Sequence, residues 1–294
     1  MSHDLRILQP YRPDGIFNHK VKLESYIGSC SFGCKYCFTR NYNNDQKTSP
    51  HKIFAEYGRE EFSRILGEEL DRTRKIVDMC STTDPYLPEE KEYEITRTSL
   101  EVLARKGNHV MINTKGSLIL RDLDILKEML PRVLVSVTIT HPDDGYSMVL
   151  EPYPPSSSER IELLKELASK GFKTKLNYDP VIKGYNDNPK LIRALISKIG
   201  EENLSMIDIS VLKTSEKTFR SISEADRELG KSLEEFYLKG GETGKRYRTL
   251  NAENVIDLLF PLRDVCLDFD IPVSFYRDIE TAESRDGYHL LIGD

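Results

Sequence analysis

Three of the five cysteines in this chain lie close together, in the segment YIGSCSFGCKYCFTR. Cys30, Cys34 and Cys37 have the spacing CxxxCxxC and directly follow a predicted strand. Thiolates are soft ligands that suit iron–sulfur clusters or zinc. A closed zinc site needs four ligands, and no fourth cysteine or histidine lies nearby. On a [4Fe–4S] cluster, three thiolates would leave one iron open, and the spacing with Tyr36 before the last cysteine favours such a cluster over zinc.

Short β-rich runs alternate with amphipathic helical patterns along the chain. The predicted strands are Val21–Ile27, Lys75–Cys80, His109–Thr114, Val133–Thr140, Lys173–Tyr178, Met206–Leu212 and Pro272–Tyr276. The predicted helices are Arg59–Arg72, Tyr93–Arg105, Leu120–Leu130, Ser158–Lys170, Pro189–Ile199 and Ala252–Phe269. Several of the strands are apolar over four or more residues, which is typical of buried parallel strands.

This alternation predicts an α/β fold with a parallel sheet and right-handed crossovers. Six strand–helix units would form an open or partial (β/α) barrel, and a doubly wound sheet is the rival architecture. In both, ligands gather at the carboxyl ends of the strands. We expect residues 1–212 to form the core and residues 213–294 a C-terminal extension that completes or caps the barrel. Within the extension, Lys213–Arg248 is charged and lacks an obvious strand, which suggests an insertion over the barrel mouth.

Composition limits the classes of function. The chain has 294 residues and a formal net charge of -6, which argues against wide contact with nucleic-acid phosphates but allows a local basic groove. An odd number of cysteines without a signal peptide indicates intracellular thiols. No apolar run is long enough to span a membrane. We therefore expect a cytoplasmic protein that does not contact a membrane.

The cysteine segment resembles the signature of the radical S-adenosylmethionine (SAM) superfamily. Further segments resemble the spore photoproduct lyase-related family, also called DNA repair photolyase-like: MCSTTDPYLPEEKEYEITRTSLEVLARKG, NTKGSLILRDLDILKEM, VLVSVTIT and LEPYPPSSSERIELLKELASKG. The resemblance covers residues 26–199. It implies a partial (β/α)6 barrel of the radical SAM type, a [4Fe–4S] cluster and SAM, whose reductive cleavage yields a 5′-deoxyadenosyl radical that abstracts hydrogen from a substrate.

The resemblance also implies which residues contact SAM. Tyr36 would lie beside the adenine, and Lys115 and Ser136 fall at positions that contact SAM in the lyase. Thr82 and Asp84 follow the second strand, where the superfamily binds the SAM ammonium group. The alternatives are a solvated lysine, a serine bonded to a backbone carbonyl and a simple Asp–Pro turn.

Four residues near the fifth and sixth strands complete the implied SAM site. Asn177 and Asp179 would bind the ribose hydroxyls, and Ile182 would pack on the base. Val211 would offer backbone hydrogen bonds to the adenine. A strand-end turn around KLNYDPVIKG is an equally consistent reading of the first three.

Cys80 is the implied redox residue. Spore photoproduct lyases carry a cysteine at the corresponding strand end, where it gives a hydrogen atom to the product radical. A buried, inert cysteine is the alternative. Two features depart from the lyase: Phe38 stands where the lyase has a tyrosine, and the run CSTTD has one residue more before its aspartate.

The resemblance implies a lyase or oxidoreductase that acts on a nucleobase or nucleotide and receives electrons from a flavodoxin or ferredoxin type of donor. A small metabolite or a peptide is the alternative substrate. A zinc-stabilised nucleic-acid-binding module without redox chemistry is the alternative from another class of protein.

Overall fold

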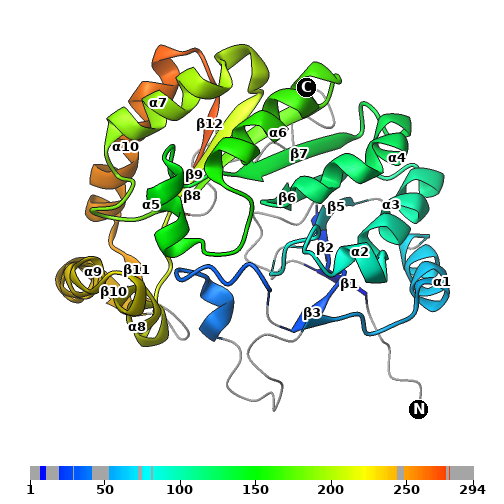
Figure 1. The fold of residues 1–294 in the computed structure, drawn as a ribbon, viewed down its shortest axis with the longest axis horizontal. Helices are drawn as coiled ribbons and strands as arrows, with labels where there is room; N and C mark the ends of the chain where they lie inside the picture. The colour runs from blue at the N-terminus through cyan, green and yellow to red at the C-terminus, as the bar shows by residue number, and fades with distance from the viewer. Residues whose placement is uncertain are drawn as a thin grey trace.

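The fold is given by a computed structural model that describes residues 7–10, 20–28, 30–41, 53–71, 75–80, 82–243, 248–275 and 278. Its central feature is a curved eight-stranded sheet with the order β1-β2-β5-β6-β7-β8-β9-β12 (Figure 1). The strands are β1 (Leu8–Pro10), β2 (Lys20–Leu23), β5 (Ile76–Met79), β6 (Val110–Thr114), β7 (Val133–Thr138), β8 (Lys173–Val181), β9 (Met206–Val211) and β12 (Val273–Ser274). All neighbours are parallel except the β1–β2 pair.

Each predicted strand corresponds to one parallel strand of this sheet. The first is shorter than expected, because β2 ends at Leu23 and a separate strand, β3 (Ile27–Gly28), pairs with β4 (Ile53–Phe54). The six strands from β2 to β9 are the six expected units of the barrel. A seventh parallel strand, β12, comes from the C-terminal extension and pairs with β9.

Helices follow the strands and cover the outer side of the sheet, as Figure 1 shows. They are α1 (Arg59–Leu70), α2 (Glu90–Tyr93), α3 (Ile95–Lys106), α4 (Leu123–Glu128), α6 (Ser157–Ser169), α7 (Pro189–Ile199) and α10 (Ala252–Asp268), with the short 3-10 helices η2 (Ser117–Asp122) and η3 (Glu201–Asn203). Helices α5 (Asp144–Leu150) and η1 (Phe38–Asn41) instead contact the insertion after β9. A doubly wound sheet would carry helices on both faces. The fold is therefore the partial barrel, and the rival architecture is wrong.

The two faces of the sheet differ in character. In β7, Val133, Val135 and Val137 belong to the main hydrophobic core that the strands share with the helices. Because side chains alternate along a strand, Leu134 and Ser136 point to the opposite, concave face. A barrel interior filled by packing alone would be lined by apolar residues. Polar residues on the concave face therefore suit the binding of a polar ligand there.

A capping box starts helix α6 and fixes its first turn. The hydroxyl of Ser156 accepts from the backbone N–H of Glu159 at 3.2 Å, and the Glu159 carboxylate accepts from the backbone N–H of Ser156 at 2.7 Å. This sets the position of Arg160, which follows at once and points into the protein interior, where its side chain is 1% exposed.

The insertion after β9 is mainly helical. It forms α8 (Glu216–Ala225), α9 (Arg227–Gly240) and the two short paired strands β10 (Gly241–Thr243) and β11 (Arg248–Leu250). The sequence shows no obvious strand here, because three-residue strands leave no pattern that periodicity can detect. Helix α8 packs against η1 and α5, beside the cysteine segment rather than across the sheet (Figure 1). Among the described residues, no helix has the length and apolar character needed to cross a bilayer.

Candidate functional site

The cysteine segment forms a compact loop between β3 and η1. Two turns shape it, with hydrogen bonds from Gly33 N to Cys30 O (3.2 Å) and from Cys37 N to Cys34 O (3.3 Å). Gly33 has a φ of +62°, and a Cβ at this position would lie 2.9 Å from the ring of Tyr153. The positive φ therefore favours glycine at this position.

The loop is docked against the end of α5, where the backbone N–H of Lys35 donates to the carbonyl of Leu150 at 2.8 Å. Cys34 is buried, while Cys30 and Cys37 are partly exposed. Burial raises the pKa of Cys34 to about 12, although the nearby Lys115 acts in the opposite direction. Burial, followed by the neighbouring Cys34, also raises the pKa of Cys30.

Thiols in such surroundings stay protonated until a metal centre binds and displaces their protons. Three soft donors on one partly buried loop fit a [4Fe–4S] cluster that leaves one iron open. In the described part of the chain, no three His, Cys, Asp or Glu side chains are arranged to hold one metal ion. The choice between a cluster and zinc therefore rests on the donor set and its spacing.

Tyr36 connects the cysteine loop to a buried charge cluster. Burial, followed by the carboxylate of Glu151, holds the pKa of Tyr36 well above its usual value, so the hydroxyl keeps its proton. This hydroxyl donates to the carboxylate of Glu151. Glu151 also accepts from Arg160 Nη2 at 2.6 Å and from Thr140 Oγ1 at 3.0 Å. Burial alone would raise the pKa of Glu151, but Arg160 and Lys115 outweigh it and lower the pKa. Glu151 is therefore ionised.

Lys115 follows β6 at the edge of the same cluster. Its ammonium group lies 4.0 Å from Glu151 Oε1 and 5.7 Å from the centroid of the Tyr36 ring. Burial would lower its pKa, but the ionised Glu151 raises it, so the side chain is charged. A fixed cation beside the cysteine loop can bind an anionic group such as a carboxylate.

Asp84 organises the turn before Lys115. Its carboxylate accepts from Thr114 Oγ1 at 2.6 Å, from Lys115 N at 2.7 Å and from Tyr86 N at 2.9 Å. Burial raises its pKa, although these hydrogen bonds act in the opposite direction. The described partners of Asp84 are all protein groups. Thr82 lies nearby, and its backbone N–H donates to Glu24 at 3.1 Å.

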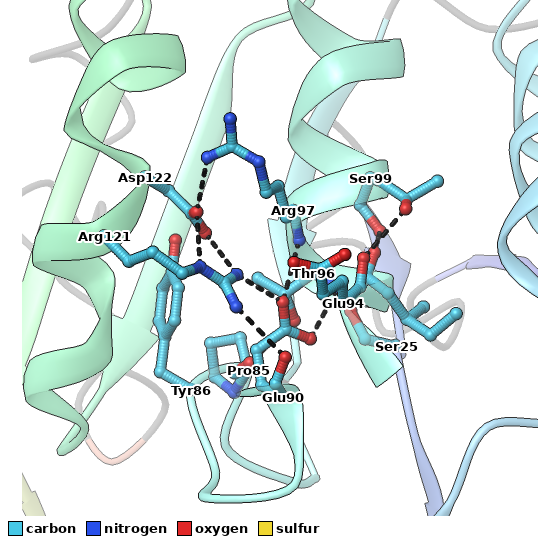
Figure 2. Close-up of polar contacts among 12 residues, drawn as sticks. Ser25, Pro85, Tyr86, Glu90, Glu94, Thr96, Arg97, Ser99, Arg121 and Asp122 are labelled. Atoms are coloured by element: carbon cyan, nitrogen blue, oxygen red, sulfur yellow. Dashed lines mark hydrogen bonds and ion pairs between the residues drawn. The ribbon is translucent and has the colours of Figure 1, made fainter. Parts of the chain in front are cut away.

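A buried carboxylate, Glu90, joins helix α2 to the start of α3 and to η2 (Figure 2). Glu90 is fully buried and accepts from Arg121 Nη2 at 2.6 Å and from Thr96 N at 2.9 Å. Sequence reasoning missed this network, because the run EEKEYE has the composition of an exposed helix turn. The glutamate is recognisable only from its place in the fold.

Cys80 directly follows β5 and has an unusual backbone conformation, with a φ of +57°. Its thiol is buried, with Ser25 N 3.4 Å and Ser25 Oγ 3.5 Å from the sulfur. Burial and then the nearby Glu24 hold the pKa of Cys80 well above its usual value. The group is thus a neutral thiol that retains its S–H bond. Positive φ is uncommon for a residue other than glycine and is often found at functional sites.

Ser136 lies on the concave face at the centre of the sheet. It is 2% exposed, and its hydroxyl has no hydrogen-bond partner among the described residues. Around it, the same face carries the ion pairs Lys20–Asp78 (3.5 Å) and Lys175–Asp208. The concave face is therefore rich in buried polar groups.

The four residues predicted near β8 and β9 differ in their surroundings. Asn177 donates to Thr138 Oγ1 at 3.0 Å, and burial raises the pKa of Asp179 to about 7, although Lys213 acts in the opposite direction. Ile182 is completely buried. The N–H of Val211 donates to Asp278 at 2.6 Å, so in this conformation it is not directed at a ligand.

Comparison with known proteins places this chain in a superfamily. Residues 25–196 match the profile of the radical SAM superfamily, which is more than half of the chain, so the protein belongs to that superfamily. Its members use a [4Fe–4S] cluster and SAM. The cofactor prediction is thereby confirmed at the level of the superfamily, and the zinc-stabilised module is not supported.

Relatives and solved structures give further similarities. An uncharacterized protein of Methanocaldococcus jannaschii is 29% identical over 185 residues, which cover 60% of this chain and 66% of that protein. A radical SAM Nalpha-GlyT isomerase of Pseudomonas phage M6 is 25% identical over 169 residues, 57% of this chain and 34% of the phage enzyme. Spore photoproduct lyase complexed with dinucleoside spore photoproduct is 14% identical with a TM-score of 0.70, covering 92% of this chain and 79% of the lyase.

A second fold relative is SuiB of Streptococcus suis bound to its precursor peptide SuiA. It is 16% identical with a TM-score of 0.51, and the alignment covers 74% of this chain and 46% of SuiB. At these identities, the two structures show a shared fold and nothing more about the chemistry of this chain.

Proposed function

We propose that this chain is a radical SAM enzyme in which Cys30, Cys34 and Cys37 bind the [4Fe–4S] cluster. The observation that carries the proposal is the docking of the three-thiol loop beside Lys115, at the carboxyl ends of the parallel strands. When bound, the cluster would supply to SAM an electron from a flavodoxin or ferredoxin type of donor, and the chemistry so made available would be hydrogen abstraction from a substrate by a deoxyadenosyl radical.

Three residues are proposed to hold SAM directly. Lys115 supplies a charge for the carboxylate of SAM, beside the ring of Tyr36. Ser136 has a buried hydroxyl that a ligand can satisfy, and such groups are seldom left without a partner. Thr82 offers a hydroxyl at the end of β5. Asp84 acts through the Lys115 backbone.

The nucleoside part of SAM is proposed to lie toward β8 and β9. Asn177 and Asp179 are the polar groups suited to ribose hydroxyls. Ile182 and Val211 are buried and form the wall behind them rather than the contact surface.

The substrate is proposed to be polar and to enter over the concave face. Two charged pairs on that face, Lys20–Asp78 and Lys175–Asp208, match a ligand with several hydrogen-bonding groups. A nucleobase or nucleotide fits this description and agrees with the dinucleoside ligand of the fold relative. A small metabolite or a peptide is the second candidate, favoured by the net charge of -6 and by the peptide-bound SuiB structure.

Cys80 is proposed to donate a hydrogen atom to the substrate radical. The hydrogen leaves the Sγ–H bond and forms a new bond on the substrate, which leaves a sulfur radical on Cys80. One electron from the external donor and one proton restore the thiol. Phe38 has no phenolic O–H bond that could supply a hydrogen atom for this return step, so the proposal assigns the step to the external donor.

The test of the proposed function is a sequence of two measurements. Anaerobically purified protein should be brown with absorbance near ~400 nm, and its reduction by dithionite with SAM should release methionine and 5′-deoxyadenosine. Deuterated dinucleotides, nucleotides and peptides are then compared for deuterium transfer into 5′-deoxyadenosine. Colourless protein, or iron-loaded protein that never cleaves SAM, contradicts the proposal. Deuterium transfer from peptides but not from nucleotides would support the second candidate, a peptide substrate.

A further inference from the structure

The carboxylate of Glu151 lies where four parts of the molecule meet, and its side chain is 0% exposed. Tyr36 reaches it from the cysteine loop, Lys115 from the end of β6, Thr140 from the chain after β7 and Arg160 from α6. Fully buried carboxylates are rare unless they are paired, so the burial of Glu151 depends on these partners.

The two oxygens of this carboxylate face different groups. Oε2 accepts from Arg160, whose guanidinium also donates to the carbonyl of Thr138 at 2.8 Å and so ties α6 to β7. Oε1 accepts from the Tyr36 hydroxyl and is the oxygen closest to Lys115. Oε1 also accepts from Thr140 Oγ1 at 3.0 Å, so Glu151 joins the scaffold to the groups next to the cysteines.

Charge is unevenly balanced in this cluster. Arg160 and Lys115 are both cations, with side chains 1% and 16% exposed, and Glu151 is the anion between them. All three act electrostatically on Cys34. Without Glu151, one buried and one partly buried cation would face the cysteine loop with no anion between them, and a buried charge that loses its partner is costly.

We infer that Glu151 is a positioning residue that fixes Tyr36 and Lys115 against the cysteine loop, and that its charge sets the reduction potential of the cluster. The inference rests on the proposed function, because it takes Cys34 as a cluster ligand. A reduced cluster carries one more negative charge than an oxidised one. Nearby positive charge therefore favours reduction, and the negative charge of Glu151 holds the potential lower.

The deciding variants change the charge of this cluster. Glu151→Gln keeps the volume and can still accept from Tyr36, but it removes the negative charge. The double variant Glu151→Gln/Arg160→Gln removes one charge of each sign and restores the original net charge. Glu162→Gln, on the exposed side of α6 and paired with Lys165, is the matched control. The measurement is an EPR-monitored redox titration of anaerobic, iron-loaded protein, together with iron content.

Glu151→Gln should shift the reduction potential upward, the double variant should return it toward the wild-type value, and Glu162→Gln should leave it unchanged. If Glu151 and Arg160 form only a structural ion pair, the reduction potential of the double variant should differ from the wild-type value at least as much as that of the single variant. A potential in Glu151→Gln equal to wild type overturns the inference.

Loss of iron from Glu151→Gln is also decisive. Recovery of iron in the double variant supports the charge balance, whereas loss in both variants assigns Glu151 to folding alone and overturns the inference. If the wild-type protein itself held no cluster, the proposed function would fail first, so the two failures are distinguishable.

Discussion

The backbone N–H of Lys115 donates to the carboxylate of Asp84 at 2.7 Å. This bond joins the loop after β5 to the loop after β6 and fixes the point from which the Lys115 side chain starts. Thr114 donates to the same carboxylate at 2.6 Å. The direction of the lysine toward the cysteine loop is therefore built into the backbone, which is the preorganisation that a binding site needs.

Replacing Lys115 by methionine tests its role in holding SAM. The variant keeps most of the apolar stem and removes the charge. Affinity for SAM should fall by about 1.5–3 kcal/mol, the range for a hydrogen bond to a charged group, while iron content stays unchanged. Calorimetry on anaerobic protein measures this. Lys165→Met, which removes an exposed lysine of α6, is the control. Equal SAM affinity in wild type and Lys115→Met would show that Lys115 does not bind SAM and has only a structural role.

Replacing Cys34 by alanine tests the cluster ligands. Each thiolate supplies a bond that water cannot match, so Cys34→Ala, and likewise Cys30→Ala and Cys37→Ala, should lose the [4Fe–4S] cluster after anaerobic reconstitution. Cys266→Ala is the matched control, because Cys266 is completely buried in α10. It should keep its iron and lose about 1 kcal/mol of stability. Four irons per chain in Cys34→Ala would contradict the assignment.

The sequence is most informative about elements with a strong period. The seven parallel strands were predictable because each is a β-rich run between helices, as in Val133–Thr138. The cysteine loop was predictable because ligand spacing is local in the chain.

Residues that act over long sequence distances were not predictable in this way. Tyr36 and Glu151 are 115 residues apart, and nothing in YPPSSSER signals that the preceding glutamate is buried. The same holds for Val211, whose N–H is taken by Asp278, 67 residues later. Hydrogen-bond partners of this kind are set by the packing of strand ends, which no local pattern encodes.

Asp179 should make stability depend on pH. Its pKa is about 7 in the folded protein, against 3.8 for the free side chain. Between these values the folded state holds a proton that the unfolded state has lost, so stability falls as pH rises toward 7 and then levels off. Since one pKa unit corresponds to about 1.4 kcal/mol, the loss is at most about 4 kcal/mol.

Urea denaturation of anaerobic protein at pH 5, 6, 7 and 8 measures this dependence. Asp179→Asn should flatten the decline between pH 5 and 7. Asp124→Asn is the control, because hydrogen bonding to Arg97 lowers the pKa of Asp124 to about 2, outside this window. Parallel pH curves for wild type and Asp179→Asn would show that Asp179 titrates normally.

The role of Cys80 is tested by products rather than by turnover. Hydrogen abstraction precedes the step that needs a thiol, so Cys80→Ala should still bind the cluster and cleave SAM. If Cys80 quenches the substrate radical, the unquenched radical should appear as adducts with solvent, dithionite or oxygen. Mass spectrometry of the products detects these adducts.

Two further variants separate chemistry from packing at Cys80. Cys80→Ser keeps the volume and the contact with Ser25, but its stronger O–H bond makes it a poor hydrogen donor, so it should give the same adducts as Cys80→Ala. Cys80→Gly relaxes the backbone, which has a φ of +57° at this position, and should lose the donor without backbone strain. If Cys80 is only buried packing, alanine should cost roughly 1 kcal/mol of stability and leave the products unchanged. The same product distribution in wild type, Cys80→Ala and Cys80→Ser at equal turnover would rule out hydrogen donation by this thiol.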